Sequence, residues 1–172
     1  EIGSGLVGSE MCIRDRFQTY GVEPDIMSLA KGIADGVPMG AVVAKKEIAD
    51  VFKPGDHGST FGGSCLAIAA CAATLSALVR GDYAEHAAKV GAYMEAKLAK
   101  LPHVTEVRGR GLMLGCDLDD AAGDAHGVVA RALAAGAVIN ATGAHTLRFL
   151  PPLVCEEADV DSLIEILSGV LG

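Results

Sequence analysis

A single lysine, Lys31, ends a short apolar run and is followed by glycine. This run, 26–30, and a second one, 40–44, are separated by a loop rich in glycine that contains Pro38, so we expect two neighbouring strands flanking Lys31. A lysine at the end of a buried strand needs a partner or a chemical role, because burying an unpaired ammonium is unfavourable. Desolvation would keep its amine neutral and nucleophilic, able to condense with an aldehyde. For a lysine considered alone, a solvated position in a loop is the better interpretation.

A second feature is the segment 57–63, with the sequence HGSTFGG, which precedes a long alanine-rich run. Ser59 and Thr60 supply hydroxyl groups there. Hydroxyls and free backbone N–H groups just before a helix form a good site for a phosphate. Ordinary loop and N-cap chemistry is the alternative for this pair, and for the pair alone it is preferred.

A third feature is Arg148, which lies among apolar residues in the segment 147–153, LRFLPPL. The planar guanidinium group matches a carboxylate bidentately, so an arginine in apolar surroundings indicates a carboxylate partner. A surface salt bridge is the alternative, and the apolar neighbours weaken it.

The segments YGVEPDIMSLAKG, FKPGDHGSTFGG and LRFLPPL occur in this order along the chain. They closely resemble motifs in the C-terminal half of class III pyridoxal-phosphate-dependent aminotransferases, and the resemblance extends from about Phe17 to the C-terminus. Within the class the motifs are most similar to those of acetylornithine aminotransferases. Ornithine and succinylornithine aminotransferases share these patterns, so the resemblance leaves the three open.

The resemblance implies an α/β fold: the C-terminal part of a fold-type I PLP-dependent transferase, with the end of its large mixed-sheet domain and its small α/β domain. It implies transfer of an amino group from N-acetylornithine to 2-oxoglutarate, a step of arginine biosynthesis, with pyridoxal 5'-phosphate as cofactor. Lys31 would bind the cofactor covalently and carry protons. Thr60 would contact the cofactor phosphate from the neighbouring subunit of a homodimer, Ser59 would contact the substrate, and Arg148 would clamp a substrate carboxylate.

Two departures from the family pattern stand out. Ser64-Cys65 occupies the place where the family often has Asn-Pro, which alters the start of the following helix. The family carries, before the lysine strand, an aspartate that pairs with the pyridine nitrogen, whereas residues 6–15 resemble a translated transposon-adapter sequence. We therefore expect residues 1–16 to be a non-native tail and the chain to be a truncated fragment without activity of its own. A PLP-dependent aminomutase or racemase and a non-catalytic remnant remain alternatives.

Composition excludes several other classes. The net charge of −8 argues against a nucleic-acid partner or an anionic membrane surface, and no apolar run reaches the roughly 20 residues needed to span a bilayer. The five cysteines form no CxxC pair and indicate reduced, mostly buried thiols of a cytoplasmic protein. The histidines lack metal-binding spacing, so we expect no metal site.

Periodicity predicts alternating helices and strands, which gives the α/β class. We expect residues 17–101 to end the large domain with its connecting helices, and residues 102–172 to form the small domain. The expected helices are 45–52, 64–79 (buried near the sheet), 83–101, 126–135 and a last one from about Asp159. The expected strands of the small domain are 104–108, 112–118, 138–139 and 147–150.

Overall fold

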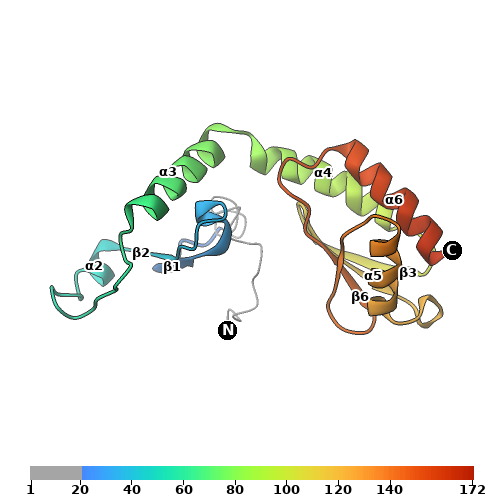
Figure 1. The fold of residues 1–172 in the computed structure, drawn as a ribbon, viewed down its shortest axis with the longest axis horizontal. Helices are drawn as coiled ribbons and strands as arrows, with labels where there is room; N and C mark the ends of the chain where they lie inside the picture. The colour runs from blue at the N-terminus through green and yellow to red at the C-terminus, as the bar shows by residue number, and fades with distance from the viewer. Residues whose placement is uncertain (1–20) are drawn as a thin grey trace. The chain divides into compact units, whose positions relative to one another are not determined.

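The computed structural model describes residues 21–172 (Figure 1). The chain divides into two compact units, of which the first ends at Asp82 and the second comprises Tyr83–Gly172. The segment that we interpret as a non-native tail, residues 1–16, lies outside the described residues. Within residues 21–172 no single helix is long and apolar enough to cross a membrane, and only α3 and α4, defined below, reach the required length and hydropathy when taken together.

The first unit contains the two strands expected around Lys31. Strands β1 (Ile26–Leu29) and β2 (Ala41–Ala44) pair in antiparallel register, with Leu29 opposite Ala41. The chain between them begins with a short 3-10 helix, η2 (Lys31–Ala34). Its last two residues, Ile33 and Ala34, are buried with Cys71 of the following long helix. This small apolar cluster fastens the turn that carries Lys31.

Two helices complete the first unit, and both differ from expectation. Helix α2 covers only Lys46–Ala49, and α3 covers Cys65–Arg80. The expectation that α3 is buried is wrong: within it only Ala67 and Cys71 are buried, while Leu66 is 72% exposed. The buried cluster of this unit is small and touches a single stripe of the helix, against which Ala70 and Leu75 pack in part, while Leu66, Ile68 and Val79 stay exposed among the described residues.

The second unit is a four-stranded antiparallel sheet packed against helices. Its elements are α4 (Tyr83–Leu98), β3 (Val104–Arg110), β4 (Met113–Leu118), η3 (Asp120–Ala122), α5 (Ala125–Ala134), β5 (Asn140–Ala141), β6 (Thr146–Phe149) and α6 (Glu157–Leu171). The strand order is β3-β4-β6-β5. Helix α4 contacts β3 and β4, α5 contacts β5 and β6, and α6 lies beside α4 and α5 (Figure 1).

Alternation along β4 and β6 separates two faces of this sheet. Leu114, Cys116 and Leu118 of β4 are buried, as are Leu147 and Phe149 of β6. They form the core face and pack against apolar residues of the helices, including the expected stripe of α4, namely Val90, Met94 and Leu98. The residues between them are half-buried and belong to the opposite face, because successive side chains of a strand alternate.

Several element boundaries differ from the sequence prediction. Residues 138–139 are not a strand: Val138 is 87% exposed, and the strand begins only at Asn140. The chain needs these residues to pass from α5 to the sheet edge after Gly136, which has a positive φ of 100°. Helix α6 begins at Glu157, because Glu156 and Asp159 form a reciprocal capping box at its start.

The two compact units also divide the chain earlier than expected. We expected the small domain to begin near residue 102, whereas α4 packs on β3, β4 and α6 and belongs to the second unit. The helix contributes Ala87, Val90, Met94 and Leu98 to the core of that unit.

Candidate functional site

Lys31 follows β1 by one residue and begins the turn to β2. Its backbone φ is 54°, in the left-handed region that residues other than glycine rarely adopt. Such a conformation costs on the order of 1–3 kcal/mol and persists where the surrounding structure holds it, often at functional sites. Here the β1–β2 ladder on one side and buried Ile33 and Ala34 on the other fix the turn. The lysine is exposed, so the desolvation expected for it is not found within the described residues.

A second lysine of the same unit differs in its surroundings. The Nζ atom of Lys45 lies 2.8 Å from Asp25 Oδ1 and 3.7 Å from Glu23 Oε1. The hydrogen bond with Asp25 raises the pKa of Lys45 above its ordinary value. Lys45 is therefore held protonated by acidic neighbours, which suits an ion pair and not a nucleophile.

The segment 57–63 is an exposed loop that leads into α3. Gly62 lets this loop fold tightly, because a Cβ atom at this residue would lie 2.9 Å from the Cβ of Ser59. Gly63 has a φ of 73°, and Ser64, the residue before α3, makes no capping hydrogen bond with its side chain. The Ser64 side chain thus does not cap the first N–H groups of α3. The predicted anion site requires such uncapped N–H groups. Ser59 and Thr60 are both exposed.

Arg148 lies in the middle of β6, between buried Leu147 and Phe149. Alternation places its side chain on the face opposite the core. Its Nε atom is buried and has no hydrogen-bond partner within residues 21–172. Arg148 forms no ion pair with any of residues 21–172. The surface salt bridge that we considered as the alternative is therefore not found in the described part of the chain. A buried donor without an acceptor is unfavourable, which supports a ligand at this position.

A polar network that the sequence analysis missed occupies the same face of the sheet. Arg108 of β3 donates to Asp117 of β4 through both terminal nitrogens, Nη1 and Nη2, and Thr146 Oγ1 of β6 donates a hydrogen bond of 2.5 Å to Asp117 Oδ1. The hydrogen bonds from Arg108 and then Thr146 lower the pKa of Asp117. The three residues come from three strands, and only the strand register brings them together. We call this face, with Arg108, Gly115, Asp117, Thr146 and Arg148, the polar face.

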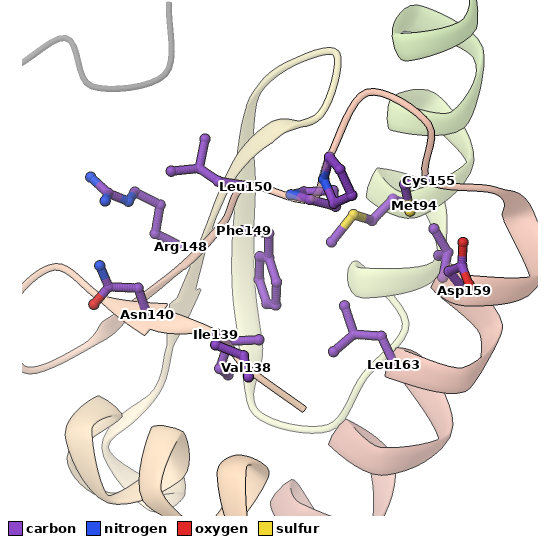
Figure 2. Close-up of a pocket in the computed structure, with 13 residues that line it drawn as sticks. Met94, Val138, Ile139, Asn140, Arg148, Phe149, Leu150, Cys155, Asp159 and Leu163 are labelled. Carbon is purple, nitrogen blue, oxygen red and sulfur yellow. The ribbon is translucent and has the colours of Figure 1, made fainter. Parts of the chain in front are cut away.

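A pocket of about 600 Å³ opens beside the end of β6 (Figure 2). Most of its lining is apolar, with Phe149 at its centre and Met94 and Leu163 among the side chains across from it. Arg148 and Asn140 also line it, and Figure 2 shows both side chains directed away from Phe149 toward the same side. The pocket thus joins an apolar wall to two polar groups on neighbouring strands.

The structure places the four candidate residues in two units. Lys31, Ser59 and Thr60 lie in the first unit, and Arg148 lies in the second. Lys31 and the 57–63 loop offer, within one unit, an amine and a set of hydroxyl and N–H donors. Arg148 offers a guanidinium group in the other.

Comparisons with known proteins relate this chain to transaminases. An acetylornithine aminotransferase from Caldanaerobacter subterraneus is 46% identical over 90% of this chain, and one from Bacillus subtilis is 37% identical over 90%. The chain spans about 40% of the length of both relatives. Among solved structures, the ornithine aminotransferase of Toxoplasma gondii matches with a TM-score of 0.84 at 32% identity, over 96% of this chain and 40% of that one.

A second solved structure is an amine transaminase from an uncultivated Pseudomonas species in a PLP-bound form. It matches with a TM-score of 0.81 at 31% identity, over 95% of this chain and 41% of that one. Both structural matches confirm the α/β fold class expected from the sequence. Class III aminotransferases use pyridoxal phosphate. A family model described as aminotransferase class-III matches residues 10–171, and on this match, together with these relatives, the chain belongs to the class-III aminotransferase family.

Proposed function

We propose that these residues belong to an aminotransferase that moves an amino group from N-acetylornithine to 2-oxoglutarate with pyridoxal 5'-phosphate as cofactor. The observation that carries the proposal is Lys31, a lysine held in a left-handed turn between two paired strands. An amine is the group that reacts with the cofactor's aldehyde, and the strain of its backbone is typical of a functional position. The names of the most similar curated relatives support acetylornithine as the donor.

The residues present fit this cofactor by the chemistry of their donors. Lys31 would hold it through Nζ, and the hydroxyl of Thr60 would donate to its phosphate from the neighbouring subunit. The bound cofactor supplies an electron-withdrawing ring that stabilises negative charge on the reacting substrate carbon. The free Lys31 amine would accept a proton from that carbon at Nζ, as a general base, and would then donate the same proton from Nζ to the cofactor's aldehyde carbon, as a general acid. Ser59 would orient the substrate from the same loop.

Arg148 would bind a carboxylate of the amino donor or of 2-oxoglutarate. Among the described residues its Nε has no acceptor, and the residue is half-buried on the polar face, which supports a planar anion as the partner of its guanidinium group.

The decisive test is the substrate preference of the intact enzyme. We expect kcat/KM with 2-oxoglutarate to be highest for N-acetylornithine, lower for N-succinylornithine and lowest for ornithine. Equal or higher values with ornithine would assign the enzyme to the ornithine aminotransferases, which the similar solved structures from Plasmodium and Toxoplasma represent. Amino exchange between glutamate and 2-oxoglutarate is expected in every aminotransferase of this kind, so its absence would favour an aminomutase or racemase.

We further propose that the 172 residues alone have no aminotransferase activity. In the described residues the β1–β2 sheet has only two strands, Lys31 is exposed, and Val42 and Leu66 are 71% and 72% exposed. A two-stranded sheet is marginally stable, and a solvated lysine lacks a dry site in which to act. The chain should be assayed with acetylornithine, 2-oxoglutarate and pyridoxal phosphate. Turnover comparable with a full-length relative would contradict this proposal, whereas no absorbance band of bound cofactor would support the non-catalytic remnant.

The remaining proposals concern assembly and setting. Exposed apolar residues on α3 support a homodimer in the intact enzyme, in which Thr60 would act across the subunit boundary; sedimentation equilibrium of that enzyme tests it. The cysteines at 65, 71, 116 and 155 are free thiols, which supports a reducing, cytoplasmic setting.

Complementation of an arginine auxotroph that lacks this aminotransferase tests the role in arginine biosynthesis.

A further inference from the structure

The polar face carries one row of residues that crosses the whole four-stranded sheet. In register, Arg108 of β3 lies opposite Gly115 of β4, Gly115 opposite Arg148 of β6, and Arg148 opposite Asn140 of β5. Directly opposite residues of antiparallel strands point to the same face, with Cβ atoms about 5 Å apart. Asn140 and Arg148 are therefore immediate neighbours, as Figure 2 also shows.

The two ends of this row differ in how their polar groups are used. The guanidinium group of Arg108 is bound to Asp117, so it is committed to the network described above. Arg148 has a buried Nε atom that finds no acceptor in the described part of the chain. Gly115 stands between the two arginines and adds no side chain to the row.

Gly115 is not required by the fold at this position. A Cβ atom here would lie 3.7 Å from the O atom of Arg108 and 3.8 Å from both the Cγ of Arg108 and the Cγ2 of Thr146, which is ordinary contact. Glycine inside a strand is unfavourable by about 0.5–1 kcal/mol relative to alanine. Its presence keeps the surface beside Arg148 open, as a bound anion needs.

The side chain of Asn140 is oriented by its own backbone. The backbone N–H of Ala141 donates a hydrogen bond of 2.8 Å to Asn140 Oδ1. Only the oxygen of the amide can accept from an N–H group, so this bond fixes which end of the side chain is which. The Nδ2 group, with its two donors, makes none of the hydrogen bonds found among the described residues, and it stands beside Arg148.

We propose that Asn140 and Arg148 together form a carboxylate clamp, in which Asn140 Nδ2 donates to the same substrate carboxylate that Arg148 binds. The inference rests on the proposed function of Arg148. A carboxylate accepts at about four sites, of which a guanidinium fork uses two, so an amide donor from the next strand adds a hydrogen bond without competing with the arginine. Asn140 thereby selects a planar carboxylate over groups that lack its acceptor geometry.

Titration of the ¹⁵N-labelled 172-residue chain with glutarate, an unreactive dicarboxylate, tests the clamp by NMR. We expect the Arg148 Nε–H and Asn140 Nδ2 resonances to move together. Asn140→Ala should weaken glutarate binding about 10-fold, the equivalent of one charge-assisted hydrogen bond, and Asn140→Asp about 100-fold, because it places a negative charge beside the anion. The neutral analogue glutaramide should not bind.

Thr142→Ala is the matched control, since Thr142 is exposed, two residues further along, and outside the row. It should bind glutarate as the unaltered chain does, and the backbone amide spectrum of the second unit reports whether each variant is folded. Unchanged affinity in both Asn140 variants, with the Arg148 shift retained, overturns the clamp but not the role of Arg148. No shift at Arg148 overturns both, and equal binding of glutaramide shows that the site does not recognise a carboxylate.

Discussion

Gly91 of α4 lies directly against Gly111 in the turn between β3 and β4. A Cβ atom at Gly91 would be 2.1 Å from the carbonyl oxygen of Gly111, and Gly111 itself has a φ of 53°. The helix and the sheet can approach this closely only because Gly91 has no side chain, whereas a Cβ atom at Gly111 would make ordinary contact with Ala87 at 3.6 Å. Gly91→Ala should therefore lower the free energy of unfolding by about 1–3 kcal/mol, as other overpacking changes do, when measured by urea denaturation.

Gly127 is the matched control for this change. It is also a helical glycine, in α5, but a Cβ atom there would meet only the flexible end of Arg131, at 3.6 Å. Gly127→Ala should be neutral or stabilising by up to about 1 kcal/mol, because alanine favours the helix. Equal effects of the two substitutions would contradict the importance of the Gly91–Gly111 contact.

Borohydride reduction in the presence of pyridoxal phosphate should attach the cofactor to Lys31. Lys45 is the internal comparison, because its ion pair with Asp25 raises its pKa and keeps it protonated. Peptide mapping by mass spectrometry gives the site. In the intact enzyme Lys31→Ala should lower kcat at least about 100-fold, since it removes both nucleophile and proton carrier. Labelling of Lys45 or Lys46 in place of Lys31 would refute the assignment.

Arg148→Lys should raise the KM of the intact enzyme for its carboxylate substrates about 10- to 100-fold. An ammonium group cannot reproduce the two parallel hydrogen bonds of a guanidinium fork, and a charge-assisted hydrogen bond is worth about 1.5–3 kcal/mol. Steady-state kinetics with each substrate varied in turn provides the measurement. An unchanged KM for both the amino donor and 2-oxoglutarate would place Arg148 outside the substrate site.

Asp117 should make the stability of the second unit depend on pH in the acid range. Hydrogen bonds from Arg108 and Thr146 lower its pKa in the folded state below the ordinary value of 3.8. Its contribution is therefore complete above about pH 5 and is lost as the pH falls through the folded-state value. The difference in unfolding free energy between the parent chain and Asp117→Asn should shrink over this range in urea titrations.

Thr146→Val should give a pH dependence of the unfolding free energy between those of the parent chain and Asp117→Asn. It removes the hydroxyl that donates to Asp117 and leaves the hydrogen bonds from Arg108 in place. A difference between the parent and Asp117→Asn that stays constant from pH 6 to about pH 2 would show that the carboxylate is not stabilised by these partners.

Much of the secondary structure follows from local patterns. The β1–β2 pair and the apolar stripe of α4 were predicted because their periodicity is regular and their ends are marked by glycine or proline. The strand expected at 138–139 was wrong, since apolar residues also occur in a connection that leaves Val138 exposed. The burial expected for α3 was wrong because an apolar sequence does not determine how many other elements pack against the helix.

Some residues of the candidate site could likewise be predicted from the sequence, and others could not. Lys31 and Arg148 could be singled out because a charged residue in an apolar run is conspicuous in a sequence. Asn140, Gly115 and Asp117 could not, because their significance depends on which strands are neighbours and in what register. The unusual φ of Lys31 is likewise visible only in three dimensions.

The backbone conformation of Lys31 brings the stability of this turn and the reactivity of its side chain into opposition. A glycine would adopt a φ of 54° without steric penalty, whereas any side chain there is strained by about 1 kcal/mol or more. Lys31→Gly should accordingly be more stable than Lys31→Ala, although neither has an amine. At this position a stable fold favours glycine, whereas a reactive amine requires lysine. The presence of lysine means that the reactive group is kept at the expense of stability.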